Sequence, residues 1–366
     1  MRTKHAVWSG LCGLCVGVLG CGSNESDGAS SNGGGAGASG IGGAHVTHDA
    51  DTGGSGGSSA NGSGGNASGG SAGDIGSGGG TGPTIGDCSV FPADNPWNQD
   101  VSELPLHPDS DTFIDSIGRD DHVHPDFGTE WEGAPIGIPV TTVIATTPDV
   151  PVVFEAYGDE SDPGPYPIPL GANVEGGPDG DGDRHVVAVD LADCKLYELY
   201  RAFPEGDAWH ADSGAVFDLG INDEHPYTFT SADAAGLPIF PGLVRYEEVV
   251  MKRELHHAVR FTVSRSRRAL VAPARHHAGS SDDPSLPPMG LRLRMKQSYD
   301  CSSYSEPARV VCDGLKRYGM IIADNGSDWY ISGAPDPRWD DDAIGDLKQI
   351  PGNAFEVVDT GPIQTY

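Results

Sequence analysis

Short apolar runs, rich in β-branched residues, recur through the last three-quarters of the chain and are separated by proline and glycine. Runs of this length bounded by turn residues are typical of strands. We therefore expect strands in the segments IGIPVTTVIAT, VPVVFEAY, HVVAVDL, CKLYELYRAF, AVRFTVSR, ALVAPA and GLRLRMK.

The clearest larger pattern lies between residues 185 and 201. Two strand-like runs, HVVAVDL and KLYELYRA, flank a short connection, which predicts a hairpin. Because successive side chains of a strand point to opposite faces, Val187, Val189 and Leu191 should share one face, and Ala188 and Asp190 the other.

Helices are expected to be few. The best candidate is SYSEPARVVCDGLKRYG, with Ser305 at the N-cap, Pro307 in the first turn and Gly319 after the last turn. DTFIDSIG and DDDAIGDLKQI are shorter candidates. Many strands with few helices predict a mainly β fold: a single antiparallel β-sandwich or jelly-roll-like domain with long loops and a few short helices.

The N-terminal segment has a different character. Arg2 and Lys4 precede an apolar run that is too short to cross a bilayer as a mature helix and that ends in Val18-Leu19-Gly20-Cys21. This stretch resembles a bacterial lipoprotein signal, although Val18 and the bulky Leu19 depart from the usual residues. The resemblance implies that residues 1–20 are a signal peptide and that Cys21 is acylated and anchors the protein to a lipid membrane.

Residues 21–86 consist largely of glycine and serine. Such a composition cannot form a core and is typical of a flexible tether. Residues 87–366 remain as one β-rich globular domain. We expect a monomer held outside the cytoplasm by a lipid anchor, on the outer membrane of the cell envelope, or a secreted protein.

Charge and cysteines limit the partners and the compartment. The chain has 22 basic and 53 acidic residues, a net charge of −31, which disfavours nucleic acid as a partner. The cysteines of the domain are Cys88, Cys194, Cys301 and Cys312. An even number in an exported chain predicts two disulfides with three possible connectivities; Cys301 and Cys312 are the nearest pair, which leaves Cys88 with Cys194.

The turn before the predicted hairpin is a candidate calcium site. Asp179, Asp181 and Asp183 alternate with other residues, and clustered carboxylates suit hard cations. An EF-hand loop needs glycine where this chain has Arg184, so a looser calcium site competes with a solvated acidic turn. Calcium is the one candidate cofactor, and none is required.

The same region supplies candidate catalytic residues. His185 begins one strand and Glu198 lies on its hairpin partner, with Asp183 at the edge. Glycosidases need one protonated and one charged carboxyl group, whereas uronate lyases need a base and a cation. Glu198 and Asp183 are thus the expected acid–base pair, and His185 or His257 the assisting base; the alternative for each is an ordinary structural role.

Basic and aromatic residues are candidates for substrate binding. We expect a glycan to contact residues of two predicted strands and of the segment after a predicted turn: Arg201, Arg292, Arg294, Trp329 and Trp339. Arginine forks bind carboxylates, and sugar rings stack on aromatic side chains. The alternatives are charge balance for the arginines and a plain turn around the tryptophans.

The globular part is similar to a family of exported bacterial proteins with no known activity, through FPADNPWN, TSADAAGLPI, PGLVRY and DNGSDWYISGAPDPRWD. This resemblance implies export and assigns no catalytic role. The sequence therefore favours a carbohydrate-active enzyme, a glycosidase or uronate lyase acting on an extracellular polysaccharide. The alternative is a non-catalytic, calcium-stabilised glycan-binding or adhesion module.

Overall fold

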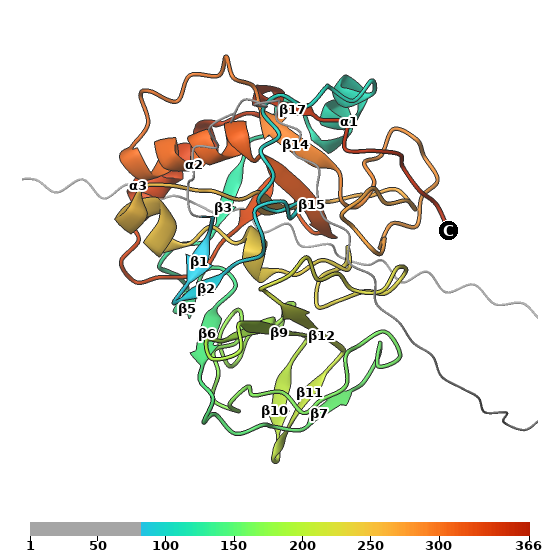
Figure 1. The fold of residues 1–366 in the computed structure, drawn as a ribbon. Coiled ribbons are helices and arrows are strands. Elements are labelled where there is room, and N and C mark those ends of the chain that lie inside the picture. The colour runs from blue at the N-terminus through green and yellow to red at the C-terminus, as the bar shows by residue number, and fades with distance from the viewer. Residues whose placement is uncertain (1–81) are drawn as a thin grey trace, which may run out of the picture. The chain divides into compact units, whose positions relative to one another are not determined.

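The computed structural model describes residues 82–366 (Figure 1). This part of the chain is mainly β, with several sheets and a few short helices, as predicted. Long loops connect the strands. The first strand pair, β1 (Thr84–Ile85) with β2 (Cys88–Ser89), begins just before the expected start of the domain at residue 87.

The largest sheet has six strands. Their order across the sheet is β17 (Phe355–Val357), β14 (Arg292–Met295), β15 (Met320–Asn325), β13 (Val259–Val263), β16 (Tyr330–Ser332) and β3 (His124–Asp126). The pairs β13–β15 and β16–β3 are parallel, while the other neighbours are antiparallel. Alternation in the sequence predicts the strands but carries no information on their relative direction.

A four-stranded sheet contains the predicted hairpin. Its order is β12 (Ser213–Asp218), β9 (Lys195–Tyr200), β8 (Val186–Asp190) and β6 (Val140–Val143), with β6–β8 parallel. Val187 and Val189 belong to the main hydrophobic core, whereas Val186 and Ala188 belong to a smaller second core. The hairpin alternates as predicted, but both of its faces are buried.

The second core lies between the four-stranded sheet and a smaller one. The smaller sheet consists of β10 (Phe203–Glu205), β11 (Ala208–Ala211) and β7 (Val152–Phe154). Trp209 of β11 is fully buried in this core, and its indole N–H donates to the carbonyl of Ile168 at 3.0 Å. The β8–β9 hairpin is therefore a middle layer with packed neighbours on both sides.

Helices cover parts of the six-stranded sheet. The α-helices are α1 (Ser110–Ile117), α2 (Glu306–Arg317) and α3 (Asp341–Ile344). The short 3-10 helices are η1 (Phe240–Gly242), η3 (Gly345–Gln349) and η4 (Gly352–Ala354), and η2 (Glu247–Lys252) is a π-helix. The predicted helix after Ser305 is confirmed as α2, which packs on β14. Gly319 follows it with φ +68°, where a Cβ would lie 2.0 Å from the carbonyl oxygen of Leu293, so only glycine fits.

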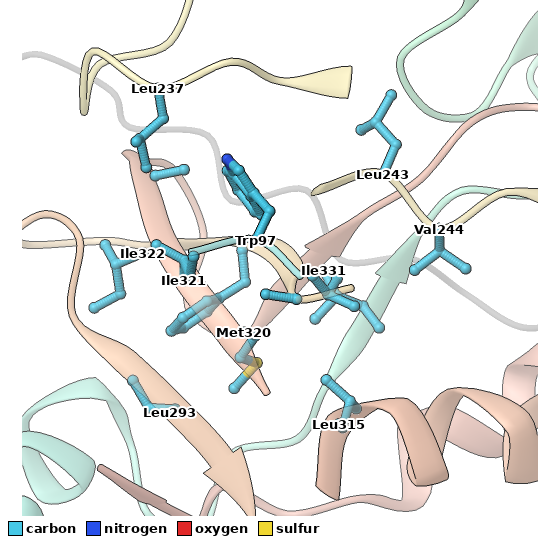
Figure 2. Packing of buried hydrophobic residues seen from close by; sticks show 14 of the residues in the cluster. Trp97, Leu237, Leu243, Val244, Leu293, Leu315, Met320, Ile321, Ile322 and Ile331 are labelled. Atoms are coloured by element: carbon cyan, nitrogen blue, oxygen red, sulfur yellow. The ribbon is translucent and has the colours of Figure 1, made fainter. Parts of the chain in front are cut away.

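The main core lies on both faces of this sheet. Leu293 is opposite Met320, and both belong to the core together with Leu315 of α2. Arg292, Ile321 and Arg260 occupy one row on the other face. Figure 2 shows Trp97, Ile321 and Leu315 among the packed side chains.

Both disulfides join the expected partners. Cys88–Cys194 ties the first hairpin to the β8–β9 connection, and Cys301–Cys312 ties the segment before α2 to that helix. Disulfides persist in oxidising compartments, which agrees with a location outside the cytoplasm. Within residues 82–366, no helix combines the length and apolarity needed to cross a bilayer.

Candidate functional site

An irregularity in β15 assembles the most unusual group of charges. Arg260 pairs with Ile321 and Phe261 with Ile322, but Thr262 pairs with Asp324, so Ala323 is an extra residue. Without this bulge Asp324 would point to the face of Met320 and Ile322. The bulge turns it to the face of Arg260, as bulges near functional sites often do.

Arg260 is the centre of this group. Its Nε and Nη2 donate to the two carboxylate oxygens of Asp233 at 2.8 Å, and Nη2 also donates to Asp324 at 3.1 Å. Nη1 donates to Ser332 Oγ at 2.8 Å. Burial lowers the pKa of Arg260, but Asp233 and Asp324 raise it further, so the guanidinium stays charged.

A cavity of about 250 Å³ opens on the other side of these carboxylates. Asp324 lines it from β15 and Tyr200 from β9, whereas Asp183 lines it from the turn before β8 and Asp233 from the loop after β12. His276 also lines this cavity, which we call the acid pocket.

The carboxyl groups of the acid pocket have unlike surroundings. Burial and the neighbouring Asp233 raise the pKa of Asp324 to about 7, against a partial opposing effect of Arg260. Asp183 is exposed at the edge, so water solvates its charge. A carboxyl group that keeps its proton near neutral pH beside a solvated one is the arrangement of an acid–base pair.

His276 has a defined orientation in the acid pocket. Its Nδ1 lies 2.7 Å from the carbonyl oxygen of Ala234. A carbonyl only accepts, so Nδ1 donates to it, and in the neutral tautomer with this proton on Nδ1 the other nitrogen, Nε2, is an acceptor. In that tautomer, Nε2 of His276 can accept a proton or a hydrogen bond from a ligand hydroxyl group.

His185, an expected base, lies behind the acid pocket and has a structural role. It is 1% exposed; Nδ1 contacts Glu175 at 2.7 Å, and Nε2 contacts the carbonyl of Ala232 at 3.1 Å. Burial lowers the pKa of His185, but Glu175 more than compensates and raises it to about 9. An imidazole that is protonated at neutral pH donates at both nitrogens and is no base there.

Glu198, the expected acid, does not reach the pocket. It is fully buried and accepts hydrogen bonds from the backbone N–H groups of Ile239 and Phe240 at 2.9–3.0 Å. Burial raises its pKa to about 7, as was expected of a catalytic acid. The perturbed pKa reflects a buried acceptor that holds turn η1, and Glu198 does not line the acid pocket.

His257 is likewise a structural residue. It is fully buried, with Nδ1 at 2.7 Å from the carbonyl of Ala258 and Nε2 at 3.2 Å from Glu248. Arg245 also contacts Glu248. This buried group lies apart from the lining of the acid pocket.

The arginines expected to bind substrate are differently placed. Arg292 and Arg294 are buried and donate to backbone carbonyls, those of Tyr318 and Pro96 for Arg292 and that of Val101 for Arg294. Burial lowers the pKa of Arg292 to about 9. They hold the N-terminal segment of the domain on β14 and present no basic surface.

Arg201 is the exposed member of the set. Its side chain is 51% exposed and lies 3.6 Å from Asp212. It is absent from the lining of the acid pocket.

The two expected tryptophans are core residues. Trp329 is 0% exposed and donates from Nε1 to the carbonyl of Gly118, and Trp339 donates to that of Ala334. Neither offers a ring face to a sugar. The aromatic and acidic residues around them in the sequence predict an exposed binding surface, but both indole rings are buried.

The acidic turn is filled by a side chain. Arg184 Nη1 donates to the backbone carbonyls of Gly177, Pro178 and Gly180 at 2.6–3.4 Å. Asp179, Asp181 and Asp183 are exposed. Across residues 82–366, no three His, Cys, Asp or Glu side chains converge as a metal site, and Arg184 supplies the positive charge in this loop.

Of the expected site residues, only Asp183 lines the acid pocket. Asp233, Asp324 and His276 were missed. The adjacent histidines at 276 and 277 and the run ADNG were visible signals, but the bulge that redirects Asp324 leaves no clear trace in the sequence.

Comparison with protein-family models, curated proteins and solved structures finds no match to this chain. The site is therefore interpreted from its own chemistry.

Proposed function

We propose that this protein is a glycoside hydrolase that cleaves a neutral extracellular glycan in the acid pocket. The observation that carries the proposal is the pairing of Asp324, whose pKa is about 7, with the solvated Asp183 in one cavity. Glycosidic hydrolysis needs one protonated and one ionised carboxyl group on either side of the bond.

The roles follow from the two environments. Asp324 donates its proton to the glycosidic oxygen as the bond from that oxygen to the anomeric carbon breaks. Asp183 takes a proton from the water molecule whose oxygen bonds to the anomeric carbon. One water is consumed, and two hydroxyl-bearing products leave. His276 Nε2 and Tyr200 are placed to bind sugar hydroxyls.

The charge of the acid pocket supports a neutral substrate over a uronate. A lyase acting on uronic acids must neutralise the substrate carboxylate. Arg260, the guanidinium behind the acid pocket, is already engaged by Asp233 and Asp324. With Asp324 protonated, the carboxylates of Asp183 and Asp233 remain to repel a further anion.

The proposed location is the outer surface of the cell envelope. The lipoprotein-like signal with Cys21 and the glycine-rich segment up to residue 86 lie outside the described residues, apart from residues 82–86. As a proposal, acylated Cys21 holds the enzyme on a tether near its polymer. Calcium has no role in this mechanism.

The test is product release from soluble neutral and uronic polysaccharides by the full-length protein. Asp183→Asn should reduce the rate by at least roughly 100-fold, whereas Asp181→Asn, in the same exposed turn, should match the wild type. Because Asp324 acts protonated, the rate should fall as pH rises through about 7.

Each alternative result has a meaning. Equal rates for Asp183→Asn and Asp181→Asn would contradict the mechanism. Release from uronic polymers alone, as unsaturated products, would indicate a lyase. Binding of a glycan without any release would favour the binding module.

A further inference from the structure

Two more cavities meet at the hairpin formed by β4 (Glu130–Trp131) and β5 (Ala134–Pro135). One has about 600 Å³ and is lined by Trp131, Asp126 and Asp341 among others; the second has about 700 Å³. Glu130 lines both. We call the two together the hairpin groove.

Trp131 is unusually placed for its residue type. It is 72% exposed, whereas the other described tryptophans, Trp97, Trp209, Trp329 and Trp339, are at most 5% exposed. The turn residues Glu132 and Gly133 have φ 51° and 87°, as a tight two-residue hairpin requires. An exposed aromatic ring beside a cavity is suited to stack on the ring of a ligand bound there.

The walls of the hairpin groove suit a hydroxyl-rich, uncharged ligand. Asp126, Glu130 and Asp341 supply acceptors, and Lys348 is the one lysine among the residues that line it. Arg184 also lines the groove, but its guanidinium is bound to backbone carbonyls. Anionic chains meet excess negative charge here.

The remaining wall of the larger cavity is rigid. Proline rings present flat apolar surfaces and lack N–H donors. The prolines that line it are Pro135, Pro139, Pro178, Pro204, Pro335 and Pro337. Sugar rings have apolar C–H faces and hydroxyl edges, which match ring walls and carboxylate acceptors together.

The hairpin groove also borders the acid pocket. Arg184 lines the groove and the preceding residue, Asp183, lines the acid pocket. The chain at these two residues therefore separates the two cavities.

We propose that the hairpin groove binds a neutral polysaccharide chain, with Trp131 stacked on a sugar ring, and delivers it to the acid pocket. This inference rests on the proposed function in taking the bound polymer to be the substrate. It adds a binding site that the hydrolytic mechanism does not require.

The experiment measures binding separately from hydrolysis. Full-length Asp324→Asn protein, expected to be inactive, is titrated calorimetrically with soluble β-glucan, arabinoxylan and galactomannan, and with polygalacturonate for comparison. Adding Trp131→Ala should weaken binding of the preferred neutral polymer by at least roughly tenfold. Trp131→Tyr should retain most of the affinity, and Tyr227→Ala, at a 40% exposed aromatic outside both cavities, should bind as the parent.

In the active protein, Trp131→Ala should raise KM for the polymer and leave kcat unchanged. Undiminished binding by Trp131→Ala, or a preference for polygalacturonate, would overturn the inference while leaving hydrolysis intact. Neutral-polymer binding that needs Trp131 in a wild-type protein that releases no product would instead reject the proposed function and keep the binding site.

Discussion

Replacing Asp324 with asparagine should change the pH dependence of folding stability. In the folded protein the pKa of Asp324 rises from 3.8 to about 7 because burial and Asp233 disfavour its charge. Each pKa unit corresponds to about 1.36 kcal/mol. Charging Asp324 therefore costs about 4 kcal/mol more in the folded protein than in the unfolded chain.

The sign follows from proton binding. A group whose pKa is raised by folding stabilises the folded state below its unfolded pKa, and this stability is lost as pH rises through the folded pKa. Wild-type protein should thus lose about 3 kcal/mol relative to Asp324→Asn between pH 4.5 and 8. Asparagine has the same shape and cannot ionise, so it provides the reference.

The assay is urea unfolding of both proteins at several pH values, with the free energy of unfolding extrapolated to water. Asp181→Asn, in the exposed turn, controls for the loss of one carboxyl group. Asparagine also weakens the contact with Arg260, which lowers the free energy of unfolding at every pH. The test is therefore how the difference in free energy of unfolding between the two proteins changes with pH. Curves for wild type and Asp324→Asn that run parallel within about 1 kcal/mol would refute the raised pKa.

Two further predictions concern buried groups behind the acid pocket. Glu198→Gln should lower the free energy of unfolding by about 1–3 kcal/mol, because the amide NH2 replaces the second oxygen that accepts from Ile239 N–H and leaves a buried donor facing a donor. The specific activity of the folded enzyme should persist. Loss of activity at unchanged stability would restore Glu198 as a catalytic acid. His185→Gln should be most destabilising below pH 6.5, because the pKa of His185 is raised from 6.5 to about 9 by folding. The loss in free energy of unfolding should shrink by about 3 kcal/mol as pH rises through 9. Urea titrations at pH 6 and pH 9.5 measure this, and a loss that is the same at both pH values would exclude the ion pair with Glu175.

Local sequence determined the elements of this protein. Alternation in residues 185–201 predicted the β8–β9 hairpin, and the cap and turn residues around α2 predicted that helix. Such features depend on neighbours along the chain, so they can be derived without tertiary structure. The even cysteine count likewise predicted two disulfides; the nearest pair, Cys301 and Cys312, and the remaining pair, Cys88 and Cys194, both formed.

Tertiary structure decided which residues make the site. Alternation assigns residues to a face, but which layer covers that face depends on distant segments. Arg292 and Trp329 are therefore buried, although the sequence around each suggests an exposed position. A single inserted residue in β15 moves Asp324 to the face of Arg260, and Arg260 also binds Asp233 from a distant loop. Asp183 and Asp324 are far apart in the sequence, and only the packing of the two sheets brings them to one cavity.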